Sequence, residues 1–172
     1  QNRICSANIY VDSFIVAEAL SHNPHIVLGG RITDPGLVVG PCIHEFSWNK
    51  NEYNKLAAAT VAGHIIECGA QCSGGNHTRW WEVEDFTNIG YPVVSIKPDG
   101  LFNVSKMEKT GGLINRMTVT EQLLYEMGNP KEYLSPDVTV DFTSVSLKET
   151  KKNTVSVSNI SGRKPSHTFK VA

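Results

Sequence analysis

The stretch from Ile26 to Gly75 constrains the fold of this chain more than any other. It begins with an apolar run that ends in two glycines, and an Arg and an Asp follow within four residues. Asp34 stands directly before Pro35, which is the order expected of an N-cap residue and the first residue of a helix. The pattern predicts a strand, a loop and a helix, with polar groups at the carboxyl end of the strand. In α/β sheets, ligands bind at this edge.

The residues before and after this loop predict a β-α-β unit. Arg3 to Val11 has the pattern of a strand, Ser13 to Ser21 that of a short helix, and His25 to Leu28 that of the next strand. Such units make parallel strands with a right-handed crossover. The helix that Asp34 is expected to cap should then run to about Phe46.

Two further helices are predicted. The first extends from Glu52 to about Gly69, and its many alanines favour a helix packed tightly between other elements. The second, Val119 to Met127, follows a capping box formed by Thr118 and Glu121. Short strands are expected at Pro92–Ile96, Leu101–Ser105, Val138–Leu147, Thr154–Ser158 and His167–Val171.

We therefore expect an α/β fold in which a parallel β-α-β core is followed by a mostly antiparallel β portion, an α+β tail. The expected division is an α/β domain over residues 1–135 and a β-rich extension over residues 136–172. The extension should pack on the same domain or on a partner. Because the chain begins and ends abruptly at predicted strands, we interpret it as a piece of a longer polypeptide with open sheet edges.

Composition excludes several classes of protein. Of the 172 residues, 40% are hydrophobic and 19% charged, which is typical of a globular protein. The formal net charge of −1 gives no support for binding nucleic acid or an anionic membrane. No apolar run approaches the roughly 20 residues of a membrane helix. Four cysteines are too few for a disulfide scaffold, so we expect reduced thiols in an intracellular protein, cytoplasmic or, in a eukaryote, mitochondrial.

The glycine loop is the first candidate ligand site, formed by Gly29, Gly30, Arg31 and Asp34. Glycines let a ligand approach the backbone, a helix N-terminus favours anions, and Arg can pair with a phosphate or carboxylate. In the alternative, Asp34 only caps its helix while Arg31 forms a structural salt bridge. There is no G-x-G-x-x-G or P-loop pattern, so a standard nucleotide site is not indicated.

A second glycine loop contains Thr110, Gly111 and Gly112. It could form an anion-binding nest or simply a tight connection. If both loops lead to helix starts on one sheet, they should line one cavity with a shared anion.

The long helix carries His64, Glu67, Cys68 and Cys72 at spacings that place them on one face. These spacings match neither C-x2-C nor H-E-x-x-H, so we expect no bound metal, and a buried His beside core thiols is the plainer interpretation. A Cys nucleophile would need a lowered pKa and a nearby base.

Acid/base catalysis is assigned to three residues. His44 and Glu45 are adjacent, and His titrates near neutrality, so this pair and His64 are the candidate catalytic residues. In the alternative, His44 and Glu45 are a feature of a helix end. Trp80 and Trp81 are interpreted as packing or interface residues, because no basic patch accompanies them.

Several blocks together resemble the acyclic terpene utilisation (AtuA-like) family. They are GGRITDP at 29–35, HEFSW at 44–48, AGHIIECGAQCSGG at 62–75, GYP at 90–92, TGG at 110–112, TVTEQLLYE at 118–126, YLSPDV at 133–138 and GR at 162–163. The resemblance covers nearly the whole chain. It departs from the common family pattern at Ile32-Thr33 and at Cys72. Members of the family extend beyond this segment on the N-terminal side, which would make residues 1–135 part of a larger N-terminal domain.

The resemblance implies a role in the catabolism of acyclic isoprenoids through branched acyl-CoA intermediates. It supplies no catalytic residues, so the reaction stays open and no cofactor is expected. The leading hypothesis is a protein that binds an acyl-CoA or similar anionic metabolite at the Arg31–Asp34 loop. The alternative is a non-catalytic assembly module that supports a branched-chain acyl-CoA carboxylase or a related complex. A homo-oligomer, or the remaining segments of the same polypeptide, are the expected protein partners.

Overall fold

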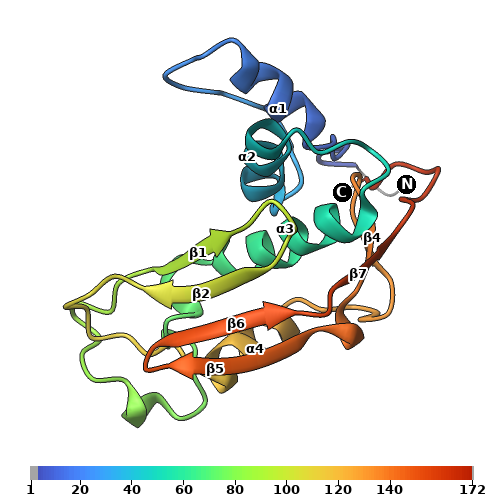
Figure 1. Ribbon diagram of the computed structural model, residues 1–172. Coiled ribbons are helices and arrows are strands. Elements are labelled where there is room, and N and C mark those ends of the chain that lie inside the picture. Colours follow the sequence, from blue (N-terminus) through green and yellow to red (C-terminus); the bar gives the residue numbers. More distant parts are fainter. Residues whose placement is uncertain (1–3, 172) are drawn as a thin grey trace.

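The structure is a computed structural model that describes residues 4–171 (Figure 1). Four α-helices lie within this range: α1 (Phe14–Ser21), α2 (Gly36–Phe46), α3 (Tyr53–Ile66) and α4 (Arg116–Leu124). Three short 3-10 helices accompany them: η1 (Gly69–Gln71), η2 (Trp80–Glu82) and η3 (Phe142–Ser144).

The strands form two antiparallel sheets. The first has the order β1-β2-β6-β5 and the second the order β3-β4-β7. The strands are β1 (Pro92–Ile96), β2 (Phe102–Lys106), β3 (Tyr133–Leu134), β4 (Thr139–Asp141), β5 (Ser146–Lys151), β6 (Thr154–Ser158) and β7 (Ser161–Arg163). Because β6 lies beside β2, strands that are far apart in the sequence share one sheet.

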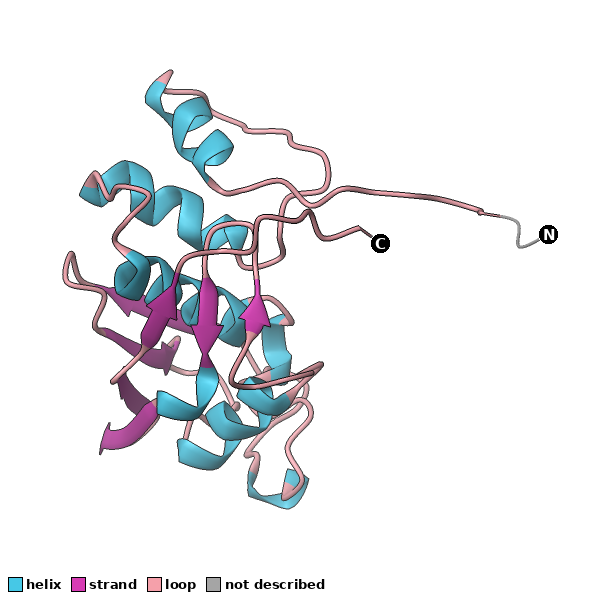
Figure 2. Cartoon of the chain, turned by 90° about the vertical axis from the view of Figure 1, so that its right-hand side faces the viewer, coloured by secondary structure: helices cyan, strands magenta, loops and turns pink. Residues whose placement is uncertain are grey.

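Helix α3 is the centre of the fold. Every residue from Leu56 to Ile65 is buried, and the helix contacts α2, α4 and strands of both sheets. It passes behind β1 and β2 and continues towards β4 and β7 (Figure 1), while α1 and α2 stack above it (Figure 2). Its small side chains allow this close packing, as predicted from the alanines. At Gly162 of β7, for example, a Cβ atom would lie 2.2 Å from the Tyr53 carbonyl oxygen.

The prediction of a parallel β-α-β core was wrong for the residues described. Both sheets are antiparallel, and the expected parallel pairing is reduced to one bridge between Val11 and Ile32. A strand requires a neighbouring backbone along its length. The apolar run at 25–28 has no such neighbour within residues 4–171, and Ile26 and Leu28 are 84% and 96% exposed. Arg3, the first residue of the other expected strand, lies outside the described residues.

The two ends of the described chain meet beside α1. The Tyr10 N–H donates to the Lys170 carbonyl, and Ile9 pairs with Val171 in a single antiparallel bridge. The strand expected at His167–Val171 is therefore limited to that bridge. At the start of α1, Ser13 donates its backbone N–H and its hydroxyl to the Asp137 carboxylate.

Two other boundaries differ from the predictions for local reasons. The strand expected at Val138–Leu147 is interrupted because the Asp141 carboxylate accepts from the N–H and hydroxyl of Thr143, which turns the chain into η3. Helix α4 begins three residues earlier than predicted because Asn115 and Thr118 form a capping box. The side chain of each residue accepts a hydrogen bond from the backbone N–H of the other. Within residues 4–171, no helix has both the length and the apolar character needed to cross a bilayer.

Candidate functional site

An unusual buried histidine lies in the last turn of α3. His64 is 2% exposed, and its Nδ1 atom is 3.3 Å from Oε1 of Glu67. The two groups are within ion-pair distance but are not aligned as a hydrogen bond, and neither ring nitrogen has a hydrogen-bond partner among the described residues. Because the large majority of buried polar groups are paired, such a residue is a marker for a functional site.

The surrounding residues fix the orientation of this imidazole. The rings of Tyr133 and Phe142 pack edge-on against it, with centroid distances of 5.8 and 5.5 Å. Gln122 of α4 donates from Nε2 to the His64 carbonyl at 3.1 Å, while its own Oε1 is buried without a partner in the described chain. The ring is thus held by packing and not by hydrogen bonds.

The helix ends immediately after His64, and this places Glu67 at a junction. Gly69 has a φ of +57°, a left-handed conformation that commonly ends helices, so α3 stops at Ile66 and η1 begins. Glu67 consequently borders two cavities, one towards α1 and α2 and one towards Tyr91 and Tyr125. Cys72 lies beyond the break, so the four residues predicted to share a helix face do not.

The cavity towards α1 and α2 is mainly aliphatic and has a volume of about 510 Å³. Its apolar walls are Val16, Val27, Ile32, Leu37, Val38 and Ile66. Gly29, Gly30 and Thr33 also line it, and two carboxylates, Asp34 and Glu67, border it. Of the predicted glycine loop, Gly29, Gly30 and Asp34 therefore line a cavity, which they share with the end of α3, whereas Arg31 does not line it.

Close packing between Gly63 and Pro35 brings the loop to this position. A Cβ atom at Gly63 would lie 2.6 Å from the Pro35 Cα atom, so the turn before α2 rests directly on the α3 backbone. Asp34 does not cap α2: the residue before the helix is Pro35, and no side chain caps it. Asp34 instead pairs with Arg31, Oδ1 to Nη1, at 3.4 Å. The Arg31 guanidinium also stacks on the Tyr10 ring at 4.9 Å.

His44 and Glu45 are not part of this site. They lie in the last turn of α2, whereas the loop that contacts α3 precedes the first turn. His44 lies eight residues along the helix from Gly36, which corresponds to a rise on the order of 12 Å. His44 is half-buried, Glu45 is exposed, and neither has a hydrogen-bond or ion-pair partner within residues 4–171.

Thr110 and Gly111, but not Gly112, line a different cavity, beside Asp85 and several lysines, so the two glycine loops do not share one. The amides of Gly111 and Gly112 donate to the carbonyls of Asn88 and Ile89. The Lys106 ammonium donates to the Thr110 carbonyl. Because these amides are already bonded, the loop has the geometry of a tight connection and not of an anion nest.

The end of α3 is electronegative. Partial burial raises the pKa of the Cys68 thiol, and the carboxylates of Glu67, Glu126 and Asp34 raise it further against a lowering hydrogen bond from Gln122. Burial, together with the same carboxylates, also raises the pKa of Tyr133. Burial raises the pKa of Cys72 to about 12. None of these groups is suited to act as an ionised nucleophile near neutral pH.

A metal site does not form from these residues. Within residues 4–171, no group of three or more His, Cys, Asp or Glu side chains has a geometry that could hold a metal ion.

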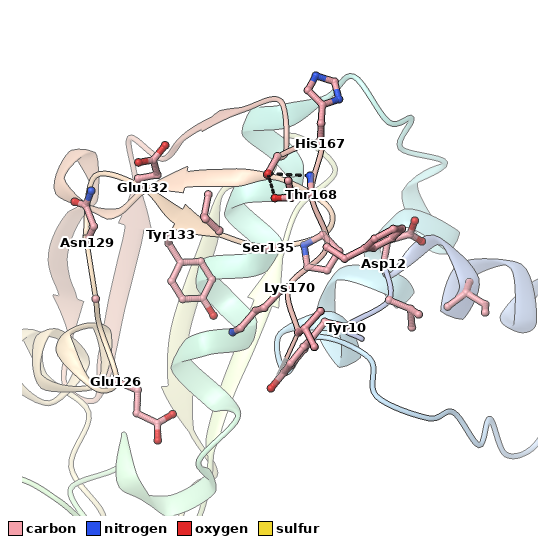
Figure 3. Close-up of a pocket in the computed structure, with 18 residues that line it drawn as sticks. Tyr10, Asp12, Glu126, Asn129, Glu132, Tyr133, Ser135, His167, Thr168 and Lys170 are labelled. Carbon is pink, nitrogen blue, oxygen red and sulfur yellow. Dashed lines mark hydrogen bonds between the residues drawn. The ribbon is translucent and has the colours of Figure 1, made fainter. Parts of the chain in front are cut away.

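Sequence analysis missed two features. The first is a cavity of about 810 Å³ between the segment 126–136 and the C-terminal residues. Tyr133 and Lys170 point towards one another across it, and the Lys170 ammonium lies 4.6 Å from the Tyr10 ring centroid (Figure 3). Its walls come from segments far apart in the sequence, so no local pattern indicates it.

The second missed feature is a pair formed by the buried His77 and the half-buried Glu121, joined by Nδ1 and Oε2 at 2.7 Å. Although burial opposes the effect, hydrogen bonds from His77 and Thr78 lower the pKa of Glu121. Sequence analysis assigned Glu121 to a capping box and therefore did not predict this contact. The contact joins the segment after η1 to α4.

The comparisons with known proteins bear on identity. The family model described as "Acyclic terpene utilisation family protein AtuA" matches residues 1–172. Searches of curated proteins and of solved structures gave no match. Since the match extends over the whole sequence, the chain belongs to the acyclic terpene utilisation family.

Proposed function

We propose that this protein binds a branched acyl metabolite of acyclic isoprenoid catabolism, with an acyl-CoA as the chemical class. The hydrocarbon tail lies in the aliphatic cavity, and the acyl head lies at its border, next to Arg31, Asp34 and Glu67. Such metabolism belongs in the cytoplasm, or in the mitochondria of a eukaryote. Acid/base chemistry on the acyl group is the enzymatic form of this proposal.

The composition of the aliphatic cavity is the observation that supports it. Six aliphatic side chains match a branched hydrocarbon, and each buried methylene contributes roughly 0.8 kcal/mol. A volume of about 510 Å³ is in the ordinary range for a small-molecule site. The polar side chains of its lining are few, Thr33, Asp34 and Glu67, which suits a mainly apolar ligand with one polar end.

Arg31 supplies the charge for the anionic part of the ligand. Its side chain is 47% exposed, and its ion pair with Asp34 has the long separation of 3.4 Å. A guanidinium carries five N–H donors, so most remain for a carboxylate or phosphate. The neighbouring carboxylates disfavour an anion elsewhere in the site, which leaves Arg31 as the place for it.

Binding of citronelloyl-CoA, measured by calorimetry, tests this proposal. Gly30 lines the aliphatic cavity, and a Cβ atom there meets nothing within 4 Å, so Gly30→Leu adds an apolar side chain at the cavity without a clash at Cβ. We expect Gly30→Leu to weaken binding at least about tenfold, through lost apolar contact. Gly128→Leu is the matched control. A Cβ atom at Gly128 also meets nothing within 4 Å, but Gly128 lines the cavity of about 810 Å³ and not the aliphatic one. The proposal is wrong if Gly128→Leu abolishes binding and Gly30→Leu does not.

An assembly module remains the second candidate, because large apolar side chains are exposed. Leu28 is 96% exposed and Ile26 84%, on a segment without strand partners in the described chain. A homo-oligomer, or another part of the same polypeptide, would cover them. Sedimentation of Leu28→Asp separates the candidates. A smaller assembly with intact citronelloyl-CoA binding would assign this face to association, and an unchanged assembly would exclude that role for it.

A further inference from the structure

The side chain of Ile32, which lines the aliphatic cavity, is held between two glycines. A Cβ atom at Gly29 would lie 2.5 Å from Cδ1 of Ile32, and one at Gly36 would lie 2.6 Å from its Cγ2. Neither glycine has a left-handed backbone conformation, so the backbone itself does not require glycine at these positions. The lack of a side chain at both positions is what makes room for Ile32.

The backbone of Ile32 is anchored as well. It forms a parallel bridge with Val11, and its N–H donates to the Gly30 carbonyl at 3.1 Å. The Val11 N–H donates to the carbonyl of Arg31, the preceding residue, also at 3.1 Å. Ile32 is half-buried, whereas Leu37, another aliphatic residue of the same lining, is 74% exposed. Ile32 is therefore a fixed part of the cavity wall, and Leu37 lies at the protein surface.

Ile32 lies where the cavity borders the charged pair. Arg31 directly precedes it and pairs with Asp34, which itself lines the cavity. In the proposed function the acyl head lies at this border, so the side chain of Ile32 contacts the carbon atoms nearest the head. In a branched acyl chain such as citronelloyl, the β-carbon carries the first methyl branch and is one of these atoms.

We infer that Ile32 determines which branch the acyl chain can carry, because it limits the width of the cavity beside the β-carbon. The inference rests on the proposed function and deepens it. The cost and the size of a void depend on how far the surrounding side chains can collapse into it. Gly29 and Gly36 have no side chains that could do so. Space that is gained by trimming Ile32 therefore stays open to the ligand.

Two single variants change this width in opposite directions. Ile32→Val removes the Cδ1 methyl group and widens the cavity. Gly29→Ala adds a methyl group to the cavity lining, 2.5 Å from Cδ1, and narrows it. In the double variant the added methyl group occupies the space that Cδ1 has left, so the width returns towards that of the wild type. Leu37→Ala is the matched control, since it removes an aliphatic side chain from the exposed part of the same lining.

Calorimetry with two ligands measures the effect. The ligands are citronelloyl-CoA and its homologue with an ethyl group in place of the β-methyl group, and the quantity compared is the ratio of their dissociation constants, ethyl over methyl. We expect Ile32→Val to lower this ratio at least about threefold, the scale of one methylene group, and Gly29→Ala to raise it by a similar factor. The double variant should return the ratio to near the wild-type value. Leu37→Ala should leave it unchanged.

Thermal unfolding without ligand tests the contact between the two side chains separately. Gly29→Ala should lower the melting temperature less in the Ile32→Val background than in the wild type, because Cδ1 is no longer there to be displaced. Equal changes in both backgrounds would show that the contact is absent and would overturn the inference.

The binding data separate the inference from the proposed function. A ratio that neither Ile32→Val nor Gly29→Ala changes, or one that Leu37→Ala changes as much, overturns the inference and leaves the proposed function intact. Failure of the wild type to bind citronelloyl-CoA overturns the proposed function itself.

Discussion

Ser13 donates both its backbone N–H and its hydroxyl to the carboxylate of Asp137, each at 2.7 Å. The two residues are 124 positions apart, and both are buried. Because Ser13 precedes α1 and Asp137 lies between β3 and β4, this contact fixes α1 relative to the second sheet. It thereby also holds one wall of the aliphatic cavity, since Val16 of α1 lines it.

The buried Asp137 should give stability a particular pH dependence. Burial raises its pKa above the ordinary 3.8, although hydrogen bonds from Ser13 oppose the shift. A carboxyl that binds its proton more tightly when folded stabilises the protein below the unfolded pKa, and loses that contribution as pH rises through the folded one. The unfolding free energy of the wild type minus that of Asp137→Asn should therefore have its highest value near pH 3 and should fall as the pH rises towards neutrality. Urea unfolding at several pH values measures it; a difference that grows with pH contradicts the assignment.

The contact between Gly63 and Pro35 predicts an unusual response to alanine. Gly to Ala normally strengthens a helix, but a Cβ at Gly63 would lie within 2.7 Å of the Pro35 backbone. Gly63→Ala should therefore destabilise by about 1–3 kcal/mol, as overpacking does, and displace the Arg31 loop. Gly128→Ala, where a Cβ meets nothing within 4 Å and φ is not positive, should instead stabilise by about 0.4–1 kcal/mol. Equal effects in thermal unfolding would show that the close approach is absent.

The buried cysteines should be unreactive in the folded protein. Burial raises the pKa of Cys42 to about 11 and of Cys72 to about 12, so almost no thiolate is present near neutrality. Iodoacetamide at pH 8 should modify these two thiols only after unfolding in urea, as peptide mass spectrometry can show. Rapid modification of Cys72 in the folded protein would contradict this prediction and would support the hypothesis of a Cys nucleophile.

Sequence patterns predicted best the elements that local signals define. The strands Pro92–Ile96 and Thr154–Ser158 were predicted with the bounds that the structure has, because turn residues flank each one. At the first turn, Gly100 has a φ of +87°, which glycine adopts readily. Helix α3 was also predicted within three residues, since its composition and helical length are local properties.

The incorrect predictions concern polar side chains that bond to a different partner from the one that the local pattern indicated. Asp34 pairs with Arg31 instead of capping α2, and Glu121 pairs with His77 instead of forming a capping box. A capping pattern records only which residues could bond, not which contact folding favours. The candidate site has the same limit: Gln122 and Tyr133, which surround His64, come from segments more than 50 residues away.

Photolabelling of the ligand site tests the central claim most directly. A citronelloyl-CoA analogue with a diazirine in its acyl chain would be bound, irradiated and mapped by mass spectrometry of the labelled peptides. We predict labels on residues 27–38 and 63–67, the segments that line the aliphatic cavity. Labels confined to residues 126–136 or 166–171, which line the cavity of about 810 Å³, would contradict the account.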